Sequence, residues 1–393
     1  MMKGNDEFIL LDSQKVVYEN ILDASRKIGK GGKKNVIIVE GGPGTGKTVL
    51  AINLLCSIIN NNLAAMYVSK NAAPRNVYKK KLKGSMRSAS VNNLFRGPDQ
   101  FHEYAEDTLD VTLVDEAHRL REKSGMFSNL GENQIKEIMK ASKLSVFFID
   151  DDQRVTVKDI GSVNEIKSQA KKLGLEITTM KLDSQFRCSG SDGYLSWLDN
   201  ILEIRETANY DLEKEWNYDF RVFDDPNKMR AAIEEKNKEN NKSRIVAGYC
   251  WDWISEGKND TNIHDIVIPK YNFEMSWNLG NSQTYAIDTN SINEIGCIHT
   301  CQGLEFDYVG VIIGDDLRYE NDSIVTDYTR RAKTDQSLKG INKIAKEQGQ
   351  VEADKIADSI IKNTYKTLMT RGMKGCYIYC TNKELQEYFK SKM

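Results

Sequence analysis

The segment from Gly41 to Thr48 constrains the fold of this chain more than any other. It reads Gly-Gly-Pro-Gly-Thr-Gly-Lys-Thr and fits the phosphate-binding pattern G-x-x-x-x-G-K-T. Glycines let the backbone N–H groups of such a loop turn inward around phosphate groups, at the positive end of the following helix. An apolar run at Val36–Val39 precedes the loop, and a helical pattern from Lys47 to Ile59 follows it. The sequence therefore predicts a strand, a phosphate-binding loop and a helix.

The loop residues have specific expected roles in binding ATP and Mg²⁺. Lys47 is expected to reach the β- and γ-phosphates, and the Thr48 hydroxyl is expected to bind the metal ion. The other loop residues that we expect to bind the nucleotide are Gly42, Gly44, Thr45 and Gly46. A dinucleotide-binding loop would need the different spacing G-x-G-x-x-G.

Two acidic residues follow a second apolar run. Val111–Val114 reads as a buried strand, and Asp115 and Glu116 come directly after it. The end of a parallel strand lies at the sheet edge that carries the phosphate-binding loop. We therefore expect Asp115 to hold Mg²⁺ and Glu116 to activate the attacking water. Hydrolysis needs a base that is not itself the main metal ligand.

Short apolar runs alternate with helical patterns along the chain, which is typical of parallel sheets covered on both faces. Strands are expected in the first half at Val36–Val39, Ala64–Val68, Val111–Val114 and Leu144–Ile149. A second series is expected at Phe220–Phe223, Arg244–Ala247, Ile295–Ile298, Tyr308–Ile313 and Gly375–Cys380. The 393 residues fit an α/β protein of two domains, at 1–180 and 181–393, with insertions near 251–293 and 315–351.

The net charge of −2 means that a nucleic-acid partner must be held by a local basic patch. From Met66 to Arg96 the chain has no Asp or Glu. The cationic residues of this stretch are Lys70, Arg75, Lys79, Lys80, Lys81, Lys83, Arg87 and Arg96. Taken alone, such a run is more often a solvated helix face. Beside a phosphate-binding loop, it favours contact with nucleic acid.

Six further segments resemble, in order, the motif series of superfamily 1 helicases. These segments are Gln14, Asn71–Tyr78, Asp150–Gln153, Gln185–Arg187, His299–Phe306 and Tyr365–Arg371. The resemblance implies two tandem RecA-like P-loop domains, with the ATP site in the cleft between them. The chain is closest to a bacterial family related to the Schlafen group 3 helicase domain. The phrases that carry this likeness are Tyr67–Arg75, Gly248–Trp251 and Gly303–Gly310.

The resemblance also implies roles for individual residues. Gln14 would read adenine, Phe186 would stack on it, and Gln153 would face the γ-phosphate. Gly303 and Glu305 belong to the motif that couples nucleic acid to nucleotide. Arg187 and Arg371 would touch the phosphates, with Arg371 as the arginine finger. Two arginines aimed at a γ-phosphate stabilise the charge of the transition state.

The direction of movement along a strand is left open by two features. Arg154 follows Gln153 where the UvrD-like branch usually has an aromatic residue. The sequence Cys301–Gly303 is closer to the RecD or Pif1 branch than to the UvrD-like branch, and proteins of these two branches move in opposite directions along a strand.

Three functions were weighed against these motifs. The first is a helicase or translocase-type ATPase that moves along, or remodels, a single nucleic-acid strand, DNA or RNA. The second is an ATP-driven switch that gates a partner nuclease, for example in anti-phage defence. A nucleotide kinase or GTPase is poorly supported, because it would not require Gln153, Arg187 and Arg371. With no long apolar run and no secretion signal, we expect a cytoplasmic protein with no membrane partner.

Two clusters have both a functional and a structural interpretation. The cysteines 297, 301, 376 and 380 could bind a metal or an iron–sulfur cluster, but 376–380 alternates like a strand. The aromatic residues 251, 253, 271, 273 and 277 could stack on bases, yet such residues more often pack an insertion against its domain.

Overall fold

The computed structural model describes residues 12–83, 88–125, 129–183, 192–212, 218–254, 260, 262–277 and 284–393. The chain forms two compact units. The first unit comprises Met1–Arg154 and Lys158–Gln185, and the second comprises Val155–Val157 and Phe186–Met393. In the parts that the structure describes, no helix is long and apolar enough to cross a bilayer.

The described part of the first unit holds a six-stranded parallel sheet in the order β3-β2-β4-β5-β1-β6. Its strands are β1 (Asn35–Gly41), β2 (Ala65–Ser69), β3 (Phe95–Arg96), β4 (Leu109–Asp115), β5 (Ser142–Ile149) and β6 (Glu176–Leu182). The four strands expected from the sequence are β1, β2, β4 and β5. The sequence analysis missed β3 and β6. β6 is an edge strand with most of its side chains partly or fully exposed, so it carries no apolar run.

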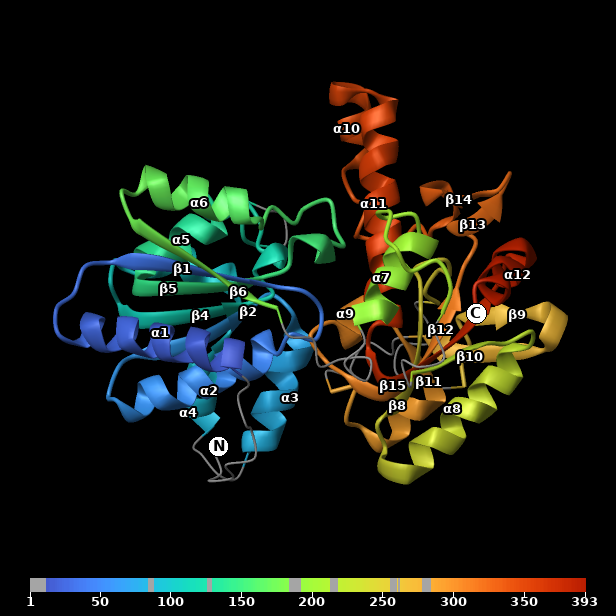
Figure 1. Ribbon diagram of the computed structural model, residues 1–393, viewed down its shortest axis with the longest axis horizontal. Helices are drawn as coiled ribbons and strands as arrows, with labels where there is room; N and C mark the ends of the chain where they lie inside the picture. The colour runs from blue at the N-terminus through green and yellow to red at the C-terminus, as the bar shows by residue number, and fades with distance from the viewer. Residues whose placement is uncertain are drawn as a thin grey trace. The chain divides into compact units, whose positions relative to one another are not determined.

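Helices cover both faces of this sheet (Figure 1). The helices of the unit are α1 (Asp12–Gly29), α2 (Lys47–Asn60), α3 (Ala72–Leu82), α4 (Ser88–Leu94), α5 (Gln134–Ala141) and α6 (Val163–Lys172). On one face, α1 and α2 bury Val17, Ile21 and Leu54 against the strands. On the other face, α5 and α6 bury Ile138 and Ile166. The sheet is therefore apolar on both sides, as its continuous hydrophobic strands predict.

The strand order brings the carboxyl ends of β1, β4 and β5 to one edge. β5 lies between β1 and β4 and is paired in parallel with both. Three segments distant in sequence therefore start from neighbouring points on this edge: the loop after Gly41, the acids at Asp115, and Asp150.

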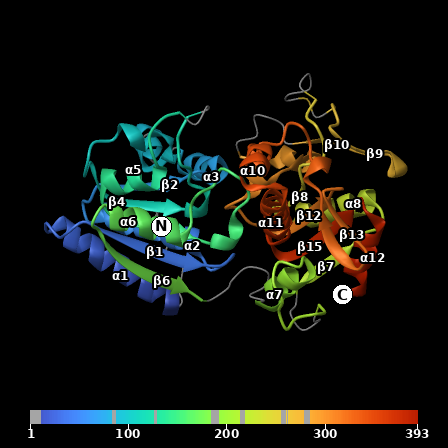
Figure 2. The same ribbon diagram turned by 90° about the horizontal axis from the view of Figure 1, so that it is seen from above.

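The second unit contains a seven-stranded sheet in the order β7-β15-β12-β8-β11-β10-β9. Its strands are β7 (Asp219–Val222), β8 (Ser243–Ala247), β9 (Ile266–Ile268), β10 (Phe273–Trp277), β11 (Glu294–Gly296), β12 (Phe306–Ile313) and β15 (Gly372–Cys380). All neighbours pair in parallel except β9 and β10, which are antiparallel. Segment 251–293, expected to be an insertion, thus adds β9 and β10 to one edge of this sheet (Figure 2).

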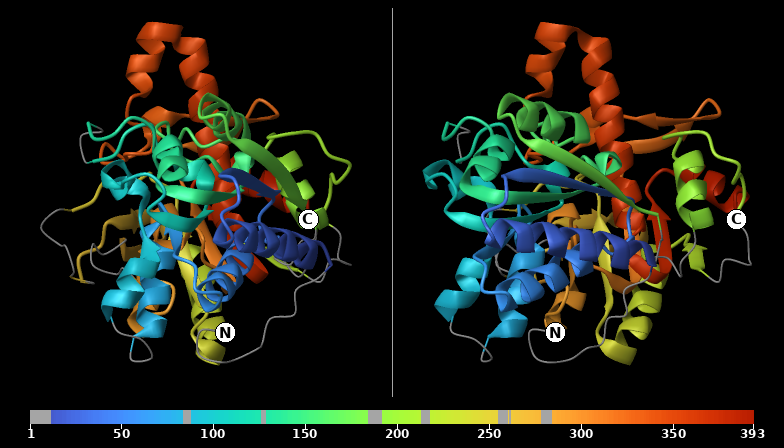
Figure 3. Two further views of the ribbon diagram at one scale, coloured as in Figure 1. Left: turned by 90° about the vertical axis from the view of Figure 1, so that its left-hand side faces the viewer. Right: turned by 60° about the vertical axis from the view of Figure 1, so that its left-hand side comes forward.

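The helices of the second unit are α7 (Asp192–Ile201), α8 (Pro226–Asn240), α9 (Ile298–Cys301), α10 (Ile341–Gln348), α11 (Gln350–Met369) and α12 (Lys383–Ser391). α10 and the start of α11 form a helical hairpin that stands out from the sheet of this unit (Figures 1 and 3). Leu338, Ile341 and Ile360 pack inside the hairpin. A small antiparallel pair, β13 (Leu317–Glu320) and β14 (Ser323–Thr326), precedes it. The expected insertion near 315–351 is therefore an ordered element.

Val155–Val157, a short segment that follows β5 in the sequence, belongs to the second unit. Val155 is buried in the main core of the second unit. Val157 packs against the helical hairpin, and its N–H donates to the Ser337 carbonyl at 2.8 Å. The chain leaves the first unit after Arg154 and returns to it at Lys158. The two units are therefore joined at three points along the chain.

Buried polar contacts fix α11 in the second unit. The Tyr365 hydroxyl donates to Asp316, and the Gly314 N–H donates to Tyr365 Oη at 3.0 Å. The next residue, Lys366, is paired with the buried Asp199. Because breaking one partner of a buried pair is costly, these contacts hold the helix against the sheet.

The aromatic group and two of the four cysteines, for which the sequence left two interpretations, can be placed in the structure. Phe273 and Trp277 are buried in the core, and Trp253 donates from Nε1 to the Trp277 carbonyl at 3.0 Å. This packing matches the structural interpretation of the aromatic group. Cys376 and Cys380 are both buried on β15. The described residues contain no group of three or more His, Cys, Asp or Glu side chains placed to bind a metal.

Candidate nucleotide-binding site

The loop between β1 and α2 has the backbone shape of a phosphate cradle. Gly44 and Gly46 have φ values of 80° and 81°, which L side chains rarely adopt. Gly46 is the N-cap of α2, so the positive end of that helix faces the loop. Lys47 Nζ donates to the carbonyls of Gly41 at 2.5 Å and Gly42 at 2.7 Å. The ammonium is thereby held at the loop by main-chain oxygens.

Gln14 reaches the same loop from α1. Its Nε2 donates to the Thr45 carbonyl at 3.0 Å, and the side chain is buried. A Cβ atom at Gly46 would lie 2.2 Å from this Nε2 atom. The structure thus brings Gln14 together with Thr45 and Gly46.

Asp115 links the loop to β4. Thr48 Oγ1 and Tyr67 Oη both donate to Asp115 Oδ2, each at 2.7 Å. Asp115 is 1% exposed, and its burial, together with the neighbouring Glu116, raises the pKa of its carboxyl group. Burial likewise raises the pKa of Tyr67 well above its usual value. Tyr67 was not expected at the site, because its position near the end of β2 reads as core packing.

Glu116 has a backbone conformation that is unusual for a residue other than glycine, with φ at 53°. Its N–H donates to Asp115 Oδ1 at 2.9 Å, and its Oε2 lies 3.0 Å from Nε2 of the buried His118. This left-handed residue turns the chain sharply at the end of β4, so that two successive carboxylates have separate partners. The sequence analysis assigned no role to His118.

Gln153 lies at the end of a short 3-10 helix, η3 (Asp151–Gln153), that follows β5. Its Nε2 donates to Asp150 Oδ2 at 2.6 Å, and Asp150 also caps this turn by accepting from the Asp152 N–H. Burial raises the pKa of the adjacent Asp151 carboxyl. The side-chain amide is therefore held at the same sheet edge as the loop.

The donor set fits a nucleotide with Mg²⁺. The loop offers a buried ammonium and a glycine-rich backbone at a helix N-terminus, the arrangement that binds phosphates. A hydroxyl and a carboxylate oxygen, the hard ligands that Mg²⁺ prefers, lie 2.7 Å apart in Thr48 and Asp115. Mg²⁺ bound with a nucleotide needs only one or two protein oxygens, because phosphates and waters complete its shell. Thr48 and Asp115 are the residues that could hold it.

The remaining predicted site residues belong to the second unit. Arg371 is 1% exposed, and its Nε donates to the Thr367 carbonyl at 3.0 Å and its Nη1 to the Leu304 carbonyl at 3.4 Å. The guanidinium therefore ties the end of α11 to the loop that contains Gly303, whose φ is 81°, and the exposed Glu305. Phe186 and Arg187 lie outside the described residues.

In the basic stretch from Met66 to Arg96, some cationic side chains are paired with carboxylates and others are exposed. Lys70 is bonded to both carboxylate oxygens of Asp99, at 2.6 and 2.8 Å. On α3 and just after it, Lys80, Lys81 and Lys83 are exposed, and Lys79 is partly buried. Burial lowers the pKa of Lys79, and the positive charges of Arg75 and Arg96 lower it further. Arg87 lies outside the described residues.

Comparisons with known proteins match most of the chain. A family model described as Schlafen group 3, DNA/RNA helicase domain, matches residues 34–382, which include both sheets. The uncharacterized protein YPL245W of Saccharomyces cerevisiae is 28% identical over 309 residues, which is 71% of this chain and 64% of the yeast protein. The chain thus spans less than two thirds of that relative's length.

A comparison with solved structures also found the following two matches, both with low TM-scores. The Pif1 helicase of Candida albicans is 12% identical and has a TM-score of 0.36, covering 98% of this chain and 99% of that one. Domain III of the replication initiation protein DnaA of Thermotoga maritima is 18% identical and has a TM-score of 0.26. That match covers 52% of this chain and 75% of the DnaA domain.

The geometry of the loop predicts that alanine destabilises the protein at one of its glycines, Gly46, and not at another, Gly42. Gly46→Ala places a side chain at a left-handed backbone position, which costs about 1–2 kcal/mol, and it also displaces Gln14. Gly42→Ala is the matched control, because its φ is not positive and a Cβ atom there meets nothing within 4 Å. Urea unfolding should show a lower free energy of unfolding for Gly46→Ala only. Equal values for the two variants would contradict the described loop geometry.

Proposed function

Because the chain belongs to the Schlafen group 3, DNA/RNA helicase domain family, we propose that it is a superfamily 1 translocase-type ATPase. It hydrolyses ATP to move along, or remodel, a single nucleic-acid strand. The observation that most supports this proposal is the hydrogen bond between Thr48 and Asp115, beside Lys47 and Glu116. It joins the two segments that phosphate-loop ATPases need for binding a nucleotide and for cleaving it.

In this proposal, the residues of the loop bind the phosphates. Lys47 exchanges the carbonyls of Gly41 and Gly42 for phosphate oxygens, and the glycine N–H groups donate to the same phosphates. Thr48 and Asp115 would hold Mg²⁺, which when bound would neutralise charge on the phosphates. Gln14, resting on the loop, contacts the adenine.

Glu116 acts as the general base in this scheme. It accepts a proton from the water that attacks the γ-phosphate, while Asp115 remains the metal ligand. His118 holds one Glu116 oxygen, 3.0 Å from its Nε2, and so orients the carboxylate. Gln153, whose side chain is hydrogen-bonded to Asp150, contacts the γ-phosphate or the attacking water in this scheme.

We further propose that the second unit completes the site with Arg187 and Arg371. Their charges stabilise the transition state and make closure of the two units depend on whether ATP or ADP is bound. The valines at 155 and 157 support such coupling, because they lie two and four residues after Gln153 and pack in the second unit. If Gln153 moved on contacting the γ-phosphate, Val155 and Val157 would move with it, and so would the helical hairpin against which Val157 packs.

Replacing each of two residues of the site should distinguish loss of ATP binding from loss of ATP hydrolysis. Lys47→Ala removes the charge that binds the phosphates, so both ATP binding and hydrolysis should be lost. Glu116→Gln keeps the shape of the site but removes the base, so ATP should still bind while turnover falls about 10²–10⁴-fold. The measurements are fluorescent-nucleotide titration and steady-state phosphate release. The exposed Glu122→Gln is the control, and normal turnover by Glu116→Gln would refute the assignment of the base.

Four lysines on and just after α3 provide a test of nucleic-acid binding. Changing Lys79, Lys80, Lys81 and Lys83 together to Gln should weaken single-strand binding about equally for all sequences. It should also flatten the salt dependence by about 0.7 log units for each lost phosphate contact. Binding is measured with labelled single strands at several salt concentrations. ATP affinity should not change.

The matched control changes four exposed lysines at the opposite, amino edge of the same sheet. These residues are Lys27, Lys30, Lys171 and Lys172, which precede β1 and β6. The overall charge changes by the same amount, so equal slopes for both quadruple variants would show that α3 makes no specific phosphate contacts.

A further inference from the structure

Tyr67 is a buried side chain of β2 that has no role in the mechanism proposed above. It is paired in register with Leu113 of β4, and both side chains pack in the same part of the core. Because alternate residues of a strand share a face, Asp115, two residues after Leu113, lies on that face as well. The Tyr67 hydroxyl reaches this carboxylate and donates to Asp115 Oδ2 at 2.7 Å.

Asp115 accepts hydrogen bonds from three different parts of the first unit. Thr48 Oγ1 and Tyr67 Oη both donate to Oδ2, each at 2.7 Å, and the Glu116 N–H donates to Oδ1 at 2.9 Å. An ionised carboxylate offers about four acceptor positions, about two on each oxygen. The donors among the described residues thus fill both positions on Oδ2 and leave one position on Oδ1 for a metal ion or a water molecule bound to it.

Neighbouring rings hold the Tyr67 hydroxyl in place. The ring of Tyr78 on α3 meets the Tyr67 ring edge-on, with centroids 6.0 Å apart, and Phe95 of β3 packs against Tyr67 at 5.6 Å. Ser69 is the register partner of Asp115, yet its buried Oγ has no hydrogen-bond partner among the described residues. Within β2, the hydrogen bond to this carboxylate therefore comes from Tyr67.

The number of free acceptor positions affects which metal ion a carboxylate can bind. Ca²⁺ takes about six to eight oxygen ligands and can bind both oxygens of one carboxylate. Mg²⁺ is smaller, keeps several waters, and needs only one or two carboxylates beside the phosphates of a nucleotide. With both positions on Oδ2 filled, Asp115 cannot offer two oxygens to one ion without losing the bond from Thr48 or from Tyr67.

We propose that Tyr67 is a positioning residue for the metal site, and that it favours Mg²⁺ over Ca²⁺ by keeping Asp115 Oδ2 occupied. Its role rests on the proposed function, because Asp115 would hold a metal ion together with a bound nucleotide. Tyr67 touches neither the ion nor the nucleotide in this scheme. It acts by fixing the carboxylate and by limiting the oxygens that the carboxylate can offer.

Tyr67→Phe tests this role, because it removes the hydroxyl group and keeps the ring. Binding of a fluorescent, non-hydrolysable ATP analogue to the full chain is measured against rising Mg²⁺ or rising Ca²⁺. The variant should need about 10- to 100-fold more Mg²⁺ for half-maximal binding, as when a residue that orients a metal ligand is lost. The Ca²⁺ requirement should rise less, because Oδ2 regains a free position. The preference for Mg²⁺ should therefore be smaller than in the wild type.

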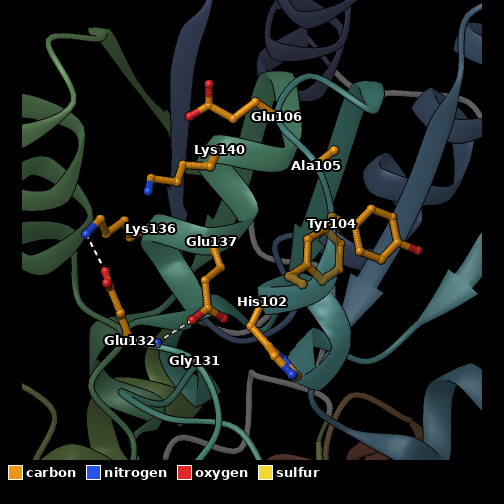
Figure 4. Close-up of a pocket in the computed structure, with 10 residues that line it drawn as sticks. His102, Tyr104, Ala105, Glu106, Gly131, Glu132, Lys136, Glu137 and Lys140 are labelled. Atoms are coloured by element: carbon orange, nitrogen blue, oxygen red, sulfur yellow. Dashed lines mark hydrogen bonds and ion pairs between the residues drawn. The ribbon is translucent and has the colours of Figure 1, made fainter.

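Two control variants separate loss of the hydrogen bond from loss of packing. Phe95→Leu disturbs the same rings but keeps the hydroxyl, so it should lower the melting temperature and leave the preference for Mg²⁺ unchanged. Tyr104→Phe removes a tyrosine hydroxyl from another part of the unit. Tyr104 precedes β4 and stacks on Phe101, with centroids 5.0 Å apart, beside a cavity of about 420 Å³ (Figure 4). This variant should match the wild type in both measurements.

The nucleotide's own affinity for each ion is the same in every sample, so differences between variants report the protein. A preference for Mg²⁺ that is unchanged in Tyr67→Phe, or absent from the wild type, would overturn the role of Tyr67 while nucleotide binding still supports the proposed function. A preference lost equally in Phe95→Leu would also overturn it, because ring packing would then set the response to metal. If the wild type binds no nucleotide with either ion, the proposed function fails, and the role of Tyr67 fails with it.

Discussion

The contact on which the site depends is the hydrogen bond from Thr48 to Asp115, which joins residues 67 positions apart in the chain. It requires β1 and β4 to end at one sheet edge with only β5 between them. It also requires α2 to begin directly after Gly46, because Thr48 lies in the first turn of that helix. The packing of helices on both faces of the sheet is thus what keeps these two oxygens within hydrogen-bond distance.

A buried carboxylate at that position is tolerated because its oxygens have donors. Thr48, Tyr67 and the Glu116 N–H all donate to Asp115. Tyr67 in turn packs against Tyr78 of α3 and Phe95 of β3, with ring centroids 6.0 and 5.6 Å away. The acidic centre is therefore connected, through packed aromatic rings, to the helix that carries the exposed lysines. If nucleic acid binds α3 as proposed, this connection is a physical route from it to the proposed nucleotide site.

The sequence allowed prediction of motifs whose residues lie close together in the chain. It did not allow prediction of contacts between residues that only the folded sheet brings together. The loop from Gly41 to Thr48 could be recognised, because its glycines and lysine sit at a fixed spacing beside a strand and a helix. Tyr67 and His118 were missed, because their roles depend on partners that only the fold brings near. β6 was missed because an exposed edge strand lacks an apolar pattern. Segment 251–293 reads as irregular because β9 and β10 are short and joined by a tight turn.

The central claim is that nucleic acid governs the ATP turnover of this chain. The most direct test is steady-state phosphate release by the full chain, with no addition, with single-stranded DNA and with single-stranded RNA at low salt. We expect low basal turnover that rises several-fold with at least one of the two strands and saturates as the strand concentration increases. Turnover that is the same with and without both nucleic acids would contradict it.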